Sequence, residues 1–151
     1  MVSRVLARLA LVALLFVGHT TGVAFGQTPT LVRWGTDGNI TVPALSPGLY
    51  YTDFDCSYGG IHLLMNNGVI LNSGGLGYNG SAPTLPPGTQ YVRVQAGGRN
   101  MFGYRSDGVV VAWGPNTPCN TIPALPAGVH YLQLDGGQSH AVGLRSDGQI
   151  M

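Results

Sequence analysis

The feature that most constrains the fold of this chain is a repeat with a period of 40 residues. Five positions of the repeat keep the same residue at that spacing between residues 43 and 151, and no gap is needed to align them. The repeated positions are Pro43, Pro83 and Pro123; Leu45, Leu85 and Leu125; Gly48, Gly88 and Gly128; Tyr51, Tyr91 and Tyr131; and Gly68, Gly108 and Gly148. A fixed period is typical of tandem units that bury their apolar faces against one another. We therefore predict repeats over 43–82, 83–122 and 123–151, the last of them truncated.

Each period predicts a connector followed by three short strands. The connectors PALSPGLYY, PTLPPGTQY and PALPAGVHY contain prolines, which cannot donate to a strand ladder, and glycines, which permit tight turns. In the second period, residues 91–96, 101–105 and 109–113 alternate or are β-branched, as strands are. The Asp107-Gly108 dipeptide predicts a two-residue hairpin turn in which both residues take positive φ. Asn66-Asn67-Gly68 meets the same requirement in the first period.

An antiparallel unit of this size cannot bury both of its faces alone. Such units stack radially into a propeller or linearly into a solenoid. The hairpin turns favour the propeller, because a parallel β-helix has coils of roughly 20 to 30 residues and lacks Asp-Gly hairpins. The predicted fold class is all-β, a partial β-propeller of about three antiparallel blades with a 40-residue period.

Two segments carry a resemblance to a known family. The strings AGGRNMFGYRSDGVVVAWGPN, from Ala96, and GGQSHAVGLRSDGQI, from Gly136, resemble the regulator of chromosome condensation repeat in its bacterial secreted form. That form has a Gly-Gly pair, often a His, a Leu-Arg-Ser-Asp-Gly hairpin and a Trp-Gly ending. The resemblance covers residues 31–151. It departs from the pattern at Ser73-Gly74, which stands where Trp-Gly is expected, and only His140 supplies the motif histidine in phase.

The resemblance implies a propeller of seven blades, more than the periods of this chain supply. Residues 27–42 precede them, and we predict that Leu31–Trp34 forms a lead-in strand of an incomplete blade. Ring closure needs at least about four blades. We expect the chain to be a fragment of a longer product, because an open arc leaves strand edges that proteins normally protect. Assembly of several copies into one ring is the alternative.

Residues 1–26 have the pattern of a secretory signal peptide. Arg4 and Arg8 precede a continuous apolar run over 9–17, and the small residues Ala24 and Gly26 come just before Gln27. An uncleaved membrane anchor is the alternative, but the run is too short to span a bilayer comfortably. We expect no membrane span after cleavage and a secreted, periplasmic or cell-surface location.

The charge pattern excludes nucleic acid as a partner. After residue 26 the chain has five arginines and six aspartates, with no lysine or glutamate. Nucleic-acid binding depends on clustered cations that displace counterions from phosphates, and no such cluster exists.

Cys56 and Cys119 are the only cysteines, and an exported protein can pair them. They stand at different phases of the repeat, so the sequence leaves open a disulfide or two free thiols.

No catalytic, cofactor or metal site is predicted, and we expect that the protein is not an enzyme. Asp107 and Asp147 are hairpin residues one repeat apart rather than a carboxylate pair. His140 has no histidine counterparts in phase, so no ring of metal ligands forms. The periodic tyrosines could form an aromatic platform for carbohydrate or peptide, but packing between blades is the favoured interpretation for them and for Trp113.

Four residues in predicted turns or connectors are candidates for a surface that contacts a partner. They are Tyr50, Tyr58, Tyr78 and Arg99. Binding residues are found disproportionately on loops that a rigid scaffold positions. The sequence predicts an exported β-propeller repeat protein that acts as a protein-binding or scaffold module, with an unidentified extracellular protein or carbohydrate as its partner. The alternative is the propeller portion of an extracellular carbohydrate-active enzyme or adhesin.

Overall fold

The part of the chain that the structure describes is almost entirely β-sheet and connectors. The computed structural model describes residues 30–35, 40–57, 59–74, 80–115 and 117–151. The signal peptide predicted over 1–26 lies outside these residues. Within them, the one helical element is the 3-10 helix η2 (Thr117–Asn120). No helix in these ranges is long and apolar enough to cross a membrane.

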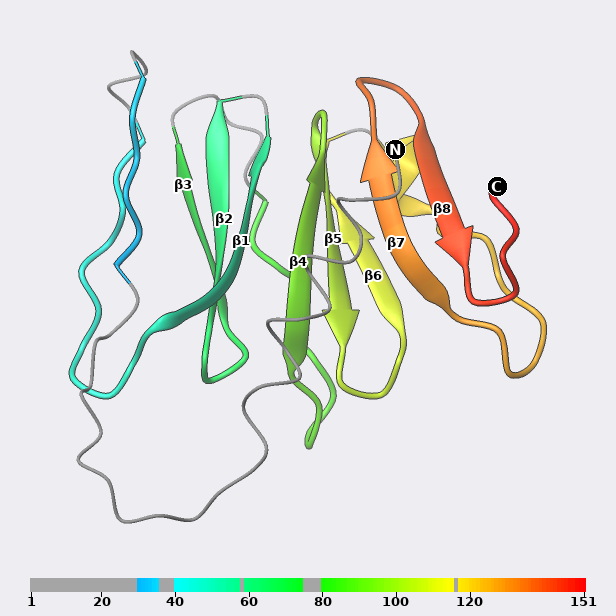
Figure 1. The fold of residues 1–151 in the computed structure, drawn as a ribbon, viewed down its shortest axis with the longest axis horizontal. Coiled ribbons are helices and arrows are strands. Elements are labelled where there is room, and N and C mark those ends of the chain that lie inside the picture. Colours follow the sequence, from blue (N-terminus) through cyan, green and yellow to red (C-terminus); the bar gives the residue numbers. More distant parts are fainter. Residues whose placement is uncertain (1–29, 36–39, 58, 75–79, 116) are drawn as a thin grey trace.

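Three antiparallel sheets follow one another along the chain and stand side by side in sequence order (Figure 1). Blade 1 consists of β1 (Tyr51–Ser57), β2 (Gly60–Met65) and β3 (Ile70–Gly74); blade 2 of β4 (Tyr91–Gly97), β5 (Asn100–Arg105) and β6 (Val110–Trp113); and blade 3 of β7 (Tyr131–Gly136) and β8 (Ala141–Arg145). A single bridge joins β8 to Ile150. The prediction of an all-β chain built from antiparallel units 40 residues apart is confirmed.

The hairpin turns differ from the predicted type. Between β5 and β6, the Gly108 amide donates to the Arg105 carbonyl (3.0 Å), and the Arg105 amide donates to the Val109 carbonyl (2.8 Å). Gly108 has φ of 84°, and no non-glycine residue in the described ranges has positive φ. This is a three-residue loop, a type I turn closed by a left-handed glycine, so the prediction of positive φ at Asp107 was wrong. The Asp107 carboxylate favours this loop by accepting from the Val109 amide (3.3 Å).

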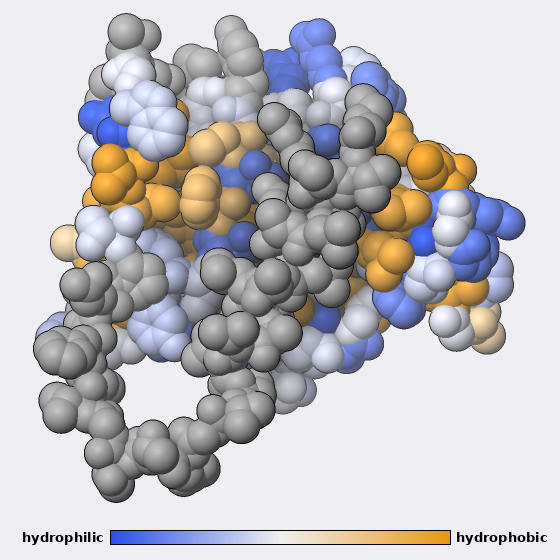
Figure 2. Space-filling view, viewed as in Figure 1, coloured by the Kyte–Doolittle hydropathy of each residue, from blue (hydrophilic) through white to orange (hydrophobic). Residues whose placement is uncertain are grey.

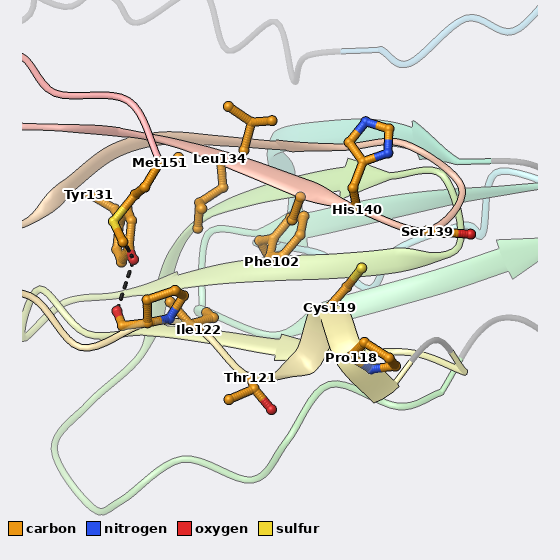
Figure 3. Close-up of a pocket in the computed structure, with 14 residues that line it drawn as sticks. Phe102, Pro118, Cys119, Thr121, Ile122, Tyr131, Leu134, Ser139, His140 and Met151 are labelled. Carbon is orange, nitrogen blue, oxygen red and sulfur yellow. Dashed lines mark hydrogen bonds between the residues drawn. The ribbon is translucent and has the colours of Figure 1, made fainter.

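The periodic tyrosines fasten each connector to its own blade. Each phenol hydroxyl donates to a proline carbonyl eight residues earlier: Tyr51 to Pro43 (2.6 Å), Tyr91 to Pro83 (2.9 Å) and Tyr131 to Pro123 (2.8 Å; dashed in Figure 3). Burial raises the pKa of all three phenols above 10, which keeps the donor proton in place. Tyr91 and Tyr131 are buried, so the packing interpretation of these residues is confirmed.

The apolar core lies between the blades rather than inside any one of them. One cluster joins blades 1 and 2 and consists of Leu64, Ile70, Tyr91, Val94, Met101 and Trp113. A second cluster joins blades 2 and 3 and consists of Phe102, Tyr104, Tyr131 and Leu134. Trp113 packs beside Tyr91 with ring centroids 6.0 Å apart, as its packing interpretation requires. Each blade therefore relies on its neighbour to cover its apolar face.

Polar side chains join the first strands of neighbouring blades. Asp53 accepts from the Val94 amide and Asp55 from the Ala96 amide, each at 3.0 Å. The first strand of each blade lies at an edge of its sheet, where backbone amides have no strand partner, so the preceding blade supplies acceptors.

Blades 2 and 3 are joined in the same way. The Gln95 side-chain oxygen accepts from the Leu134 amide (3.1 Å) and from the Tyr104 hydroxyl. Burial raises the pKa of Tyr104 to about 12, so this hydroxyl keeps its proton and remains a donor.

The lead-in strand predicted over Leu31–Trp34 is not observed. Residues 30–35 contain no strand. They border a groove of about 400 Å³ beside blade 1, together with Phe54, Cys56 and Ile61. A strand requires a backbone ladder with a neighbour. Here the segment meets blade 1 through side chains that line this groove, so the strand prediction was wrong.

Candidate partner-binding surface

The direction of the strands divides the loops between two ends of the three-blade arc. The Ser-Asp-Gly end contains the connectors and the turns over 65–69, 105–109 and 145–149, which follow the second strand of each blade. The glycine-pair end contains the turns between the first and second strands, such as the one over 97–100. Figure 1 shows the two sets of turns at opposite ends of the sheets.

Three exposed residues form a row along the Ser-Asp-Gly end. Tyr50, Gln90 and His130 stand 40 residues apart, each at the last position before a first strand, and all three are exposed. Each row residue makes two hydrogen bonds to one turn residue. Its backbone amide donates to the side chain of the turn residue, and its backbone carbonyl accepts from the amide of the same turn residue. The pairs are Tyr50 with Asn66 (3.2 and 3.0 Å), Gln90 with Ser106 (3.2 and 2.9 Å) and His130 with Ser146 (3.1 and 2.8 Å).

The Ser-Asp-Gly motif accounts for this constant frame in blades 2 and 3, and Asn66-Asn67-Gly68 takes its place in blade 1. Its first residue, Ser106 in blade 2, holds the connector through its hydroxyl and its amide. Its second residue, Asp107, caps the turn and forms an ion pair with Arg105, while Gly108 takes the left-handed conformation. The interpretation of Asp107 as a turn residue is confirmed. The same backbone geometry therefore presents a different side chain in each blade.

Contact between blades fixes the spacing of the row. A Cβ atom added to Gly68 in the turn of blade 1 would lie 2.5 Å from the Cβ of Gln90, so this turn rests directly on the next connector. The Gly68 carbonyl also accepts from the Tyr91 amide (3.4 Å). The phenol of Tyr50, the side-chain amide of Gln90 and the imidazole of His130 can each donate and accept hydrogen bonds. The row is suited to the polar surface of a folded partner.

The structure brings together only part of the residue set predicted from sequence. Tyr50 belongs to the row and is 41% exposed. Arg99 is half-buried in the β4–β5 turn at the glycine-pair end, so it does not share a surface with Tyr50. Tyr58 and Tyr78 lie outside the described residues. Gln90 and His130 were missed, although their 40-residue spacing from Tyr50 was the signal that could have identified them.

A chain of hydrogen bonds centred on the buried His62 joins the three strands of blade 1. His62 Nε2 lies 2.9 Å from the Ser57 hydroxyl, and His62 Nδ1 lies 2.8 Å from the Asn72 side-chain oxygen. The Asn72 amide nitrogen donates to the Gly80 carbonyl (2.9 Å), which orients its oxygen toward His62. Nδ1 therefore carries the proton, and Nε2 accepts from Ser57.

Burial holds His62 in its neutral form. Its side chain is fully buried, and this desolvation lowers its pKa below 6.5, although the hydrogen bond to Asn72 and the charge of Asp55 act in the opposite direction. His62 is a structural member of blade 1.

Acidification is expected to destabilise the protein through His62. In the unfolded chain the imidazole takes up a proton near pH 6.5, whereas the folded chain resists protonation to lower pH. The unfolded state then binds more protons, so the free energy of unfolding falls as the pH decreases below 6.5. Urea denaturation between about pH 7.5 and 5.5 measures the effect. His62→Gln should show a flatter pH dependence, and an equal slope in both proteins would contradict this assignment.

The two cysteines do not pair. Cys56 is exposed on β1 and Cys119 is buried in η2, and neither forms a disulfide. Partial desolvation of the thiol and the charge of Asp55 raise the pKa of Cys56. Cys119 and His140 line a groove of about 280 Å³ beside β8 (Figure 3). In the described ranges no three His, Cys, Asp or Glu side chains gather closely enough to hold a metal ion.

Similarity to known proteins is found at the level of structure. No family model matches the sequence, and no curated protein matches it. The ectodomain of the Physcomitrella patens receptor kinase CR4 superposes with a TM-score of 0.59 at 19% identity, over 78% of this chain and 34% of that one. Yeast RCC1 (Prp20), solved bound to Kap60, gives 0.59 at 19% identity, over 72% and 30%. The CRINKLY WD40 ectodomain of the Arabidopsis thaliana receptor kinase ACR4 gives 0.50 at 22% identity, over 75% and 37%.

These similarities show the fold. The chain is an arc of a β-propeller, with three antiparallel blades that correspond to blades of larger propeller-type proteins. The chain spans about a third of the length of each of these structures.

Proposed function

We propose that this protein is an exported β-propeller module of the regulator of chromosome condensation repeat type that binds a protein through the Tyr50–Gln90–His130 row. The observation that carries the proposal is the constant backbone frame of the row. Residues whose side chains differ between blades are held through their backbones by the same two hydrogen bonds in each blade. A rigid scaffold with differing exposed residues lowers the ordering cost of binding.

The structural neighbours support protein binding and an extracellular setting. Yeast RCC1 was solved as a complex with another protein, Kap60, and two other neighbours are ectodomains of receptor kinases. The signal-peptide pattern over 1–26 is consistent with that setting. Because the neighbours are about three times as long as the matched region, we place the three blades in a larger ring.

Export is expected to remove residues 1–26. Expression of the full chain in a secreting host should yield an extracellular product whose first residue is Gln27. Intact mass and N-terminal sequencing measure this directly. A product that keeps its first 26 residues and sediments with membranes would contradict the proposed export.

Partner binding through the row is tested by site-specific photocrosslinking. Benzoylphenylalanine placed at position 50, 90 or 130 of the mature chain is expected to crosslink one and the same protein from the extracellular fraction of the producing cells. Gln138, exposed at the glycine-pair end, is the matched control position and should not crosslink it. Once the partner is identified, combined alanine substitution of the row should weaken its binding at least about tenfold. Equal crosslinking from position 138, or unchanged affinity, would refute the row as the binding site.

A further inference from the structure

Asn67, in the turn between β2 and β3, differs from the other described asparagines in the contacts of its side-chain nitrogen. The others each donate a hydrogen bond from Nδ2 to an oxygen of the fold: Asn66 to Gly48 (3.1 Å), Asn72 to Gly80 (2.9 Å), Asn100 to Asn120, and Asn120 to Gly114 (2.9 Å). Asn67 is exposed, and within the described ranges its side chain is held only through Oδ1, which accepts from the Val69 amide (3.1 Å). The fold therefore leaves the side-chain nitrogen of Asn67 free to depart.

The residue after Asn67 is a glycine, so no side chain shields the backbone nitrogen that follows. The Gly68 amide donates to the Met65 carbonyl (2.9 Å), and Gly68 has φ of 78°. A hydrogen bond in a surface turn opens locally at low cost in free energy. Figure 2 shows mainly hydrophilic surface at the end of the sheets where these turns lie, so water and hydroxide reach the site.

These groups are arranged for an intramolecular reaction. The Gly68 nitrogen loses its proton to hydroxide and attacks Asn67 Cγ, which forms a new N–C bond. The Val69 amide donates to the oxygen on which negative charge develops during this attack. Nδ2 takes up a proton and leaves as ammonia, which closes a cyclic imide. Water then opens the ring at either carbonyl and leaves aspartate or isoaspartate, so the net reaction exchanges one ammonia for one water.

The equivalent turns of blades 2 and 3 do not offer this reaction. Their Gly108 and Gly148 amides close the turn through the same backbone bond, at 3.0 Å in both. The preceding residues, Asp107 and Asp147, are carboxylates in ion pairs with arginines. A carboxylate resists nucleophilic attack because it is already negatively charged. Blade 1 has Met65 at the position of those arginines and a neutral amide at the position of the carboxylates.

We propose that Asn67 is a modification site, which deamidates spontaneously in the folded chain through the Gly68 nitrogen. The aspartate product fits the turn, since Asp107 and Asp147 stand at the equivalent positions and each accepts from the amide two residues later (3.3 Å).

The isoaspartate product does not fit the turn. It adds a carbon to the backbone between Met65 and Val69, whose amide and carbonyl form a hydrogen bond of 2.9 Å. Asn66, which holds Tyr50 through two hydrogen bonds, lies in the same turn. Isoaspartate at position 67 is therefore expected to release Tyr50 from the row. The modification itself does not depend on what the row binds.

The test is incubation of the mature chain in mildly alkaline, isotope-labelled water, followed by tandem mass spectrometry. Electron-based fragmentation distinguishes isoaspartate from aspartate and position 67 from Asn79, which also precedes a glycine and lies outside the described residues. Position 67 should take up the label before any other described asparagine, at a rate that rises with hydroxide concentration. A synthetic peptide of residues 62–73 gives the unconstrained rate, and the folded chain should react at most about tenfold more slowly, the factor that one surface hydrogen bond imposes.

Asn67→Gln is the matched control. Its longer side chain must close a larger ring, which forms far more slowly, so position 67 should stay unmodified while circular dichroism shows the wild-type fold. Asn67→Asp should also keep that fold, as the aspartates of blades 2 and 3 do. Earlier modification of another described asparagine overturns the inference, and so does a folded-chain rate more than about tenfold below that of the peptide.

Discussion

Phe102→Ala is expected to lower the free energy of unfolding by about 3 to 5 kcal/mol. The Phe102 ring is 1% exposed and lies at the centre of the cluster that joins blades 2 and 3, against Tyr131 and Leu134. Truncation removes apolar contact area and leaves a cavity, which neighbouring blades can close only by shifting toward each other. Urea denaturation followed by circular dichroism measures the change.

The matched control for this substitution is Val142→Ala. Val142 occupies the equivalent position in blade 3 but is 44% exposed. Surface truncations of this kind usually change stability by no more than about 0.5 kcal/mol. A large loss in Phe102→Ala beside a small one in Val142→Ala would show that the neighbouring blade, rather than the residue's own sheet, provides the stabilisation. Similar losses at both positions would contradict the interblade core.

Gly97→Ala is expected to separate blade 3 from blade 2, at a cost of about 3 kcal/mol. A Cβ atom at position 97 would lie 2.4 Å from the Gly136 Cα and 2.5 Å from the Gly136 nitrogen. These are backbone atoms, which cannot rotate away as a flexible side chain can. The first strands must therefore move apart, which stretches the bond from the Leu134 amide to Gln95. In the Gly97→Ala variant, hydrogen exchange should be faster at the β7 amides than at the β1 amides.

Gly80→Ala is the control for the glycine substitution. A Cβ atom there would meet only the Trp113 ring, at an ordinary distance of 3.7 Å. Gly80 is not among the glycines with positive φ, so alanine introduces no backbone strain. Its stability should remain close to that of the wild type. If Gly97→Ala is equally well tolerated, the close approach of β4 and β7 does not limit which residue can stand at position 97.

The close approach of these strands also explains why a Gly-Gly pair stands at the end of the first strand in blades 2 and 3, at Gly97-Gly98 and Gly136-Gly137. Edge strands of neighbouring blades face each other through short polar side chains, such as Asp55 to the Ala96 amide. At the end of the strands this separation narrows until Gly97 and Gly136 are in backbone contact. Only residues without a Cβ atom allow that approach. The pair is a requirement of blade-to-blade packing and needs no ligand to account for it.

The period, the order of strands within each repeat and the position of each turn could be predicted from the residues alone. These follow from local rules: proline removes a ladder donor, alternation marks a half-buried strand, and Ser-Asp-Gly marks a reversal. The strands predicted over 91–96, 101–105 and 109–113 agree with β4, β5 and β6 to within one residue at each end. The burial of Tyr91, Tyr131 and Trp113 also followed from the repeat.

The contacts between repeats could not be predicted from local sequence patterns. The donors to Asp53 and Asp55 are amides 41 residues away, and no local pattern indicates them. Strand direction placed Tyr50 and Arg99 at opposite ends, because each passage along a strand carries the chain from one end of the sheet to the other. Residues 31–34 look like a strand in sequence, yet backbone pairing depends on a neighbour that only the folded arrangement can supply.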